Sequence, residues 1–220
     1  MKKILMVALI LSGSLFAISA KTIAQEPTLE QIKKVAEKGN SVAQYKMATI
    51  YFNGDGVPKN NTEALAWYLK AADQGYTVAQ YNLGAIYQSG NGAPKDYAKA
   101  LGWYRKAAEK GYAGAQNKLG MMYESGEGVP KNSTEAMKWY LKSAEQGYAG
   151  AHYNLALMHY NGTGVPKNYV KAYAWCSLAA ANGHGAGKHY LSLIESKMKP
   201  SQIKLAKSEA AGLHSKYKKS

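Results

Sequence analysis

The chain has 220 residues, of which 46% are hydrophobic and 19% charged, a composition that excludes a disordered protein. Its formal net charge at pH 7 is +14, yet every basic residue except Arg105 is a lysine. Specific recognition of nucleic acids favours the planar arginine side chain, so we expect no nucleic-acid partner. The single cysteine, Cys176, excludes an intramolecular disulfide, and stability must therefore come from packing.

Residues 1–24 have the pattern of a secretory signal peptide. Lys2 and Lys3 precede an apolar run over residues 4–17, which is too short to span a membrane comfortably. Cleavage after Ser19 and cleavage after Ala24 both fit, and an uncleaved N-terminal anchor is the alternative. No cysteine follows the run, so we expect no lipid anchor. The sequence therefore predicts a periplasmic or secreted protein with a soluble mature chain.

The rest of the chain repeats every 36 residues without a slip. Four full units cover residues 39–74, 75–110, 111–146 and 147–182. We expect residues 25–38 to form a half-repeat helix before them, residues 183–199 a half repeat after them, and residues 200–220 a lysine-rich capping helix. The period is marked by Gly39, Gly75, Gly111, Gly147 and Gly183, by Trp67, Trp103, Trp139 and Trp175, and by Pro58, Pro94, Pro130 and Pro166.

Each unit has the pattern of two helices, here called helix A and helix B. In the second unit Ala79, Leu83 and Ile86 recur at helical spacing, and the glycine- and proline-containing stretch 89–95 ends that helix. Asp96 is placed to cap helix B.

Asn60, Asn132 and Asn168 occupy the capping position of the other units. Glu63 and Glu135 follow three residues after two of these asparagines, which predicts reciprocal capping boxes. Helices of about a dozen residues are marginal alone, so the units must stack. The sequence predicts an all-α, right-handed α-solenoid with a 36-residue period.

These motifs resemble the Sel-1-like repeat family, a branch of the tetratricopeptide-like solenoids. The second unit carries the pattern as Ala79-Gln80-Tyr81-Asn82-Leu83-Gly84, Gly90-Asn91-Gly92, Pro94-Lys95-Asp96 and Trp103-Tyr104. The resemblance implies a scaffold for protein–protein interaction. Some exported bacterial members are virulence or signalling adaptors, and others are immunity proteins that neutralise a secreted lipase effector. Cysteine-rich members are linked with β-lactam binding, but the paired cysteines of those proteins are missing here.

In related solenoids the inner curved face takes residues i, i+4 and i+7 of helix A, which predicts the partner-binding residues. They are Tyr45, Thr49 and Phe52; Tyr81, Ala85 and Gln88; Asn117, Met121 and Glu124; and Tyr153, Leu157 and Tyr160. The three tyrosines at 45, 81 and 153 could instead pack between repeats. The positions that vary between units, such as Met121 and Leu157, are better candidates for specificity.

We expect no cofactor, no metal and no catalytic site. All five histidines lie in the last 69 residues, and His152 and His159 share a helix face, but the ligand spacing of a zinc site is missing. Cys176 falls on a repeat packing position, which argues against a nucleophile. The segment 183–220 contains eight lysines and two glutamates. This segment is either a solvated cap or a surface that weakly attracts acidic surfaces. We expect a monomer that binds a protein whose identity the sequence does not give.

Overall fold

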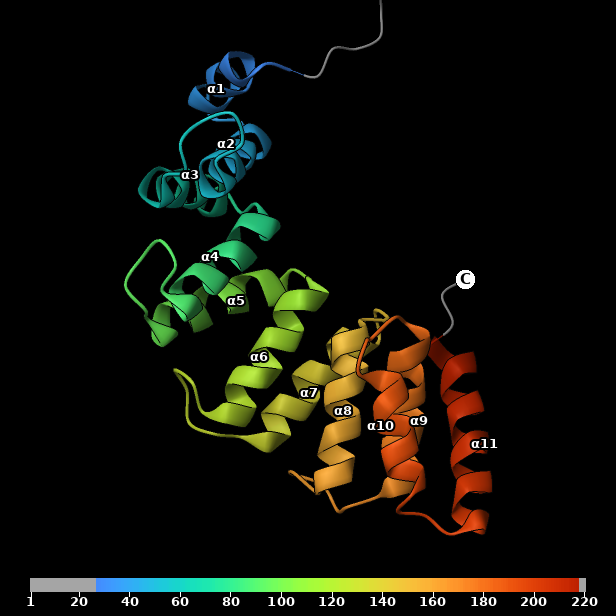
Figure 1. Cartoon of the computed structure of the whole chain (residues 1–220). Coiled ribbons are helices and arrows are strands. Elements are labelled where there is room, and N and C mark those ends of the chain that lie inside the picture. Colours follow the sequence, from blue (N-terminus) through green and yellow to red (C-terminus); the bar gives the residue numbers. More distant parts are fainter. Residues whose placement is uncertain (1–26, 218–220) are drawn as a thin grey trace, which may run out of the picture.

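The computed structural model describes residues 27–217, which form eleven α-helices and no strand. The predicted signal peptide and its cleavage sites lie outside the described residues. The helices follow one another along an open arc, from α1 at one end to α11 at the other (Figure 1). The predicted all-α solenoid of 36-residue repeats is thereby confirmed. The helices are α1 Leu29–Glu37, α2 Ser41–Asn53, α3 Asn61–Asp73, α4 Thr77–Ser89, α5 Tyr97–Glu109, α6 Ala113–Ser125, α7 Ser133–Ala144, α8 Ala149–Asn161, α9 Tyr169–Ala181, α10 Gly187–Glu195 and α11 Pro200–Tyr217.

A backbone clamp closes the loop between helix A and helix B in every unit. Gly90 ends α4 in the left-handed conformation at φ 81°, which a residue with a side chain rarely adopts. After the loop, the Asp96 amide donates a 2.8 Å hydrogen bond back to the Tyr87 carbonyl. The same 2.8 Å bond recurs in the other units, from Asn60 to Tyr51, from Asn132 to Tyr123 and from Asn168 to His159.

The predicted caps of helix B are confirmed, but the predicted capping boxes are wrong. The Asn60 and Asn132 side chains accept hydrogen bonds from the Glu63 and Glu135 amides, as expected. The reciprocal bond from the glutamate needs the amide of the capping asparagine. The clamp already uses that amide, so Glu135 pairs with Lys138 instead, at 2.7 Å. The complete capping box lies at the start of α1, between Thr28 and Gln31.

Small residues of helix A lie directly beneath tyrosine rings of helix B. A Cβ on Gly84 would stand 2.5 Å from Cδ1 of Tyr104, closer than atoms approach, so the ring needs a glycine there. Gly120 lies in the same way beneath Tyr140. Both tyrosine side chains are fully buried. Glycine therefore makes the close approach of helix A and helix B possible.

A row of buried amides joins each unit to its neighbours. Gln44 Nε2 donates to the Ala36 carbonyl at 3.1 Å, and Gln44 Oε1 accepts from Gln74 Nε2 at 2.6 Å. Gln116 repeats both bonds, with Ala108 and with Gln146. We call this arrangement the amide clasp. It satisfies a polar side chain that is nearly inaccessible to water.

Two units depart from the amide clasp. Gln80 donates to Ala72, but Lys110 stands where Gln74 and Gln146 stand, and its ammonium donates to the Gly75 carbonyl instead. Gln80 Oε1 is therefore buried without a partner among the described residues. In the fourth unit His152 replaces the glutamine. Its Nε2 lies 3.1 Å from the Ala144 carbonyl and its Nδ1 lies 3.5 Å from Asn182 Nδ2.

Helix α11 occupies the predicted capping segment 200–220, of which residues 218–220 lie outside the described residues. Ala206 and Ala210 of α11 are buried, and Leu213 and Tyr217 pack against the same core. Tyr217 lies 5.6 Å from the Trp175 ring of α9, between ring centroids. Lys207 pairs with Glu195 of α10 at 3.5 Å, while most lysines of α11 face solvent. Helix α11 thus covers the apolar end of the stack.

Lys110→Gln should stabilise the protein. The new amide can donate to Gln80 Oε1, as Gln74 and Gln146 do to their own partners, and satisfying a buried acceptor contributes about 1 kcal/mol. Urea unfolding of the full chain should show a higher midpoint for this variant. Lys46→Gln, an equally conservative change on an exposed residue of α2, is the control and should leave the midpoint unchanged. A lower midpoint for Lys110→Gln would contradict the clasp.

His152 should make the protein sensitive to acid. Burial lowers its pKa from 6.5 to about 4, because protonation would place a charge in the core, and repulsion from His214 acts in the same direction. Between these two pKa values His152 is protonated in the unfolded chain but neutral in the folded chain. The free energy of unfolding should therefore fall by roughly 1–3 kcal/mol between pH 6.5 and pH 4. Stability is unaffected by this group above pH 6.5.

His152→Gln restores the residue of the other three units and should flatten this part of the stability profile. Chemical unfolding of both proteins at pH 7 and at pH 4.5 checks the prediction. An equal loss of stability in the two proteins would show that other groups cause the acid sensitivity.

Candidate functional site

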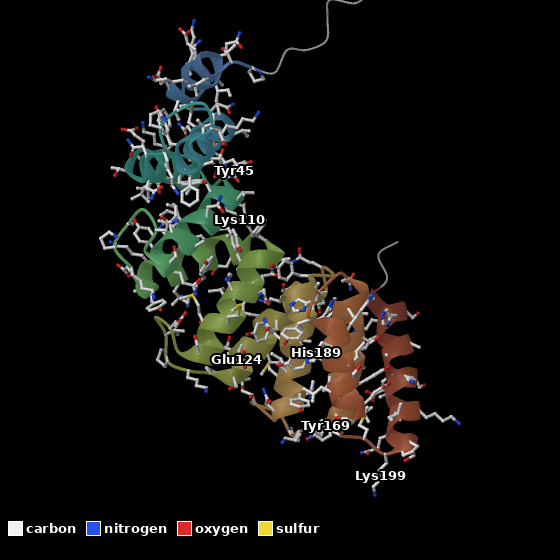
Figure 2. The ribbon with its side chains drawn as sticks, in the orientation of Figure 1. Tyr45, Lys110, Glu124, Tyr169, His189 and Lys199 are labelled. Atoms are coloured by element: carbon white, nitrogen blue, oxygen red, sulfur yellow. The ribbon has the colours of Figure 1, made fainter. Side chains whose placement is uncertain are left out.

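The twelve predicted binding residues form three rows along α2, α4, α6 and α8, and we call their surface the A-helix face. The first row is Tyr45, Tyr81, Asn117 and Tyr153, the second is Thr49, Ala85, Met121 and Leu157, and the third is Phe52, Gln88, Glu124 and Tyr160. Most of these side chains are half-buried, Asn117 is buried and Met121 is exposed. Figure 2 shows Tyr45 and Glu124, from α2 and α6, at successive places along the arc.

Tyrosines of the first row contact aromatic rings that precede the next helix A. The ring centroids of Tyr45 and Tyr76 are 5.2 Å apart, those of Tyr81 and Tyr112 are 5.1 Å apart, and Tyr153 lies 4.2 Å from His184 in a stacked pair. These contacts join adjacent units. The three tyrosines therefore pack between repeats and also expose part of each ring.

Asn117 interrupts this aromatic row in the third unit. Its side chain is only 6% exposed and accepts a 2.9 Å hydrogen bond from Asn154 Nδ2, so it supports the face from beneath rather than presenting a side chain to a partner. Tyr148 is the residue of this unit that corresponds to Tyr76 and Tyr112. Because Asn117 stands where the first-row tyrosine would be, Tyr148 lacks that aromatic contact and is 38% exposed. Met121, one turn further along α6, is 39% exposed. The middle of the A-helix face therefore carries its most accessible apolar surface.

Two residues of the third row, Gln88 and Glu124, are hydrogen-bonded to buried tyrosines of helix B. Tyr104 donates from its hydroxyl to Gln88 Oε1 at 3.0 Å, and Tyr140 donates to Glu124 Oε2 at 2.7 Å. Burial raises the pKa of the Tyr104 and Tyr140 hydroxyls, so both stay protonated and act as donors. Glu124 and Gln88 are thus held in fixed positions at the edge of the face.

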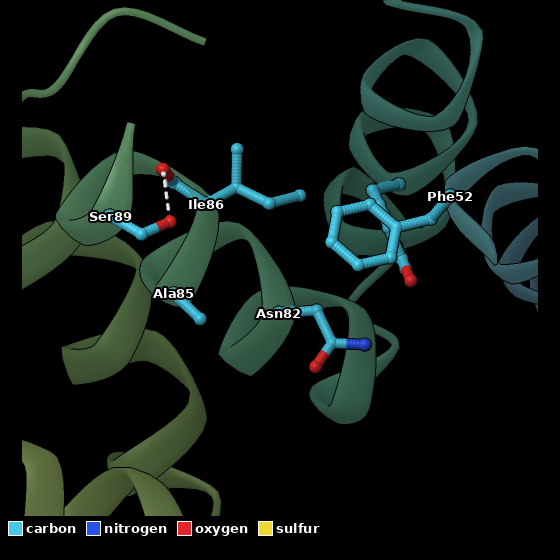
Figure 3. A pocket seen from close by; sticks show the side chains of 6 residues that line it. Phe52, Asn82, Ala85, Ile86 and Ser89 are labelled. Carbon is cyan, nitrogen blue, oxygen red and sulfur yellow. Dashed lines mark hydrogen bonds between the residues drawn. The ribbon is translucent and has the colours of Figure 1, made fainter. Parts of the chain in front are cut away.

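In the first unit the third-row residue is Phe52, which has no hydrogen-bonding group and lines a hollow. Phe52 packs edge-on against Tyr68, with centroids 6.4 Å apart. The hollow has a volume of about 290 Å³ and is lined by Phe52, Tyr68, Asn82, Ala85, Ile86 and Ser89. In Figure 3 the Phe52 ring and the Asn82 and Ala85 side chains border the same space. An apolar side chain of a partner would fit a hollow of this kind.

Sequence reasoning missed two sets of residues on this surface. Asn82 and Asn154 follow the first-row tyrosines, and their amides hydrogen-bond to Tyr45 and Asn117 of the preceding unit. The second set is Tyr76, Tyr112 and Tyr148, which stand 36 residues apart. The period alone would have revealed the second set, because it marks these tyrosines as regularly as the tryptophans.

The side chains considered for catalysis and metal binding have structural surroundings. The Cys176 thiol is buried and donates to the Gly187 carbonyl at 3.2 Å, and burial raises its pKa to about 11. A thiol in that state is a poor nucleophile. Among residues 27–217, no three histidine, cysteine or acidic side chains come close enough to hold a metal ion. Within the same range no helix combines the length and the apolar character needed to cross a membrane.

A family model for the Sel1 repeat matches residues 41–76, 77–112, 113–148 and 149–184. The chain belongs to the Sel1 repeat family. The model places each boundary two residues later than the sequence analysis did and keeps the same period. A Sel1 repeat solenoid suggests a protein–protein interaction scaffold. No match was found among curated proteins.

Solved structures share this fold. One is a protective antigen with an SLR fold present in uropathogenic Escherichia coli strains, at 40% identity and a TM-score of 0.79. The match covers 86% of this chain but only 40% of the antigen. A Sel1 repeat protein from Oxalobacter formigenes is 32% identical, with a TM-score of 0.69 and coverage of 79% of this chain and 73% of that one. An immunity protein from Pseudomonas aeruginosa is 25% identical, with a TM-score of 0.52 and coverage of 93% and 80%.

Proposed function

We propose that this Sel1 repeat protein is an exported scaffold that captures a partner protein on its A-helix face. The observation that carries the proposal is the accessible surface around Met121 and Tyr148. It lies between side chains that the scaffold fixes, including Glu124. Rigid aromatic and apolar groups beside fixed polar groups are typical of protein-binding surfaces. Little side-chain entropy would be lost at Glu124 on binding, because its hydrogen bond from Tyr140 already fixes this side chain.

Export is part of the proposal and is supported by the sequence of residues 1–24. If it is correct, the protein recovered from the periplasm or the medium should lack its first 19 or 24 residues. Intact mass spectrometry of the recovered protein distinguishes these two cleavage sites. A mass that includes residues 1–18 would contradict cleavage and favour an N-terminal anchor.

The A-helix face can be tested with matched variants in a capture experiment from periplasmic extract. Met121→Lys should reduce the recovery of the partner at least tenfold, since it puts a charge where the partner would otherwise bury an apolar side chain. Leu205→Lys, on the 54% exposed leucine of α11, is the control and should capture as much partner as the original chain. Both variants should keep their helical circular dichroism because both side chains face solvent.

Two results would contradict this assignment. Equal capture by Met121→Lys would remove the A-helix face from the proposal. Loss of capture by Leu205→Lys alone would move the binding surface to the C-terminal helix. Identification of the captured protein by mass spectrometry then gives the class of partner.

An immunity protein is the second candidate, since the Pseudomonas aeruginosa immunity protein aligns with 93% of this chain. On this account the partner is a toxic effector, and the resemblance noted in the sequence favours a lipase. Co-expression of the chain should then protect a cell that produces such an effector in its periplasm, and Met121→Lys should abolish protection. Survival that does not depend on the chain would exclude this candidate for that effector.

A further inference from the structure

A second surface, formed by residues outside the twelve of the A-helix face, has the size of a small-molecule site. A groove of about 730 Å³ runs between α11 and helices α7, α8 and α9. We call it the C-terminal groove. Its apolar wall is formed by Met137, Leu141, Leu155, Val165, Trp175 and Leu213. Pockets that bind small molecules have volumes of about 300–1,000 Å³ and are mostly apolar with a few polar groups.

One polar side chain in this wall is left without a partner. His159 is 8% exposed and lines the groove, and its Nδ1 is buried with no hydrogen-bond partner among the described residues. A buried unpaired N–H is costly, which favours the tautomer with the proton on Nε2. No side-chain hydrogen bond within residues 27–217 uses this Nε2. The imidazole is therefore available as a donor to an acceptor atom in the groove.

The charges around the groove favour an anion. Lys171 of α9 and Lys216 of α11 line it together with a single acidic residue, Glu209. Lys171 acts electrostatically on the imidazole of His159, which places its ammonium near that ring. An acidic group that approached Lys171 would thus also approach the donor nitrogen. Apart from Lys216 and Glu209, the rest of the lining offers apolar contact to the remainder of the ligand.

We propose that the C-terminal groove binds a single-chain acidic amphiphile, with its alkyl chain along the apolar wall and its acidic group beside Lys171 and His159. A long alkyl chain needs no hydrogen bonds, which matches the wall of Leu141, Leu155 and Leu213. A polar ligand such as a sugar would leave most of its hydroxyls unpaired there. This proposal does not depend on partner capture by the A-helix face.

The chain offers a variant that blocks the groove without disturbing the fold. Gly212 lines the groove from α11, and a Cβ added there would meet no atom within 4 Å. Gly212→Leu therefore fills the groove, and a leucine also favours a helix over glycine. Gly102 is an exposed glycine of α5 with equally open surroundings and is not part of the groove. Gly102→Leu is the matched control.

The test is calorimetric titration of the full chain with dodecanoate below its micelle concentration. We expect one saturable site, with decanoate about tenfold weaker because two methylenes fewer leave water. Gly212→Leu should abolish binding while melting no lower than the original chain, and Gly102→Leu should bind as before. Dodecyltrimethylammonium has the same tail and a positive head, and it should bind at least tenfold more weakly than dodecanoate.

Several results would overturn the proposal. Binding of dodecanoate that survives Gly212→Leu would place the ligand elsewhere, and the absence of any binding would show that the groove stays empty of such ligands. Equal affinity for the positive and negative amphiphiles would refute the role of Lys171 and His159. A concentration-dependent dimer that Gly212→Leu dissolves, seen by sedimentation, would show instead that a second copy of the chain covers the groove.

Discussion

The contact between a helix B tyrosine and a glycine of helix A connects the packing of the fold to the A-helix face. In the second unit the Tyr104 ring fills the space left by Gly84, and its hydroxyl continues to Gln88 on the A-helix face. Tyr140 does the same with Gly120 and Glu124. The side chain that holds two helices together therefore also fixes a polar group on the surface. Helices this short are marginally stable alone. The helix B tyrosine both packs them together and fixes a polar side chain on the A-helix face.

The last unit is different because α11 packs on it. In the first three units a lysine lies over the helix B tryptophan, as Lys106 does over Trp103 at 4.0 Å. In the fourth unit that lysine position is Leu178, and Tyr217 of α11 approaches Trp175 instead. His152, His159 and Cys176 all occur in this unit, where α10 and the capping helix α11 pack in place of another full repeat. The departures from the repeat pattern thus follow the change of neighbour.

Much of the fold could be predicted from the sequence because the same pattern of caps, glycines and apolar residues occurs in all four repeats. Spacing and side-chain chemistry predict the helix caps at Asn60 and Asp96. They also predict the glycines that end helix A and the capping helix α11. The capping boxes failed because the clamp to Tyr51 and Tyr123 uses the amides they require, which is a tertiary effect. The burial of Asn117 depends on Asn154 of the next unit. The C-terminal groove depends on how α11 docks, which periodicity does not describe.

A partner that docks on the surface around Met121 should contact this residue and leave the outer side of helix B free. Site-specific photo-crosslinking in cells that produce the protein tests this claim directly. A photoreactive residue is placed at Met121 in one variant and at the exposed Gly102 of α5 in another. If a partner docks on the A-helix face, position 121 should give a covalent adduct of one defined mass and position 102 should give none. An adduct from position 102 alone, or from neither position, would contradict it.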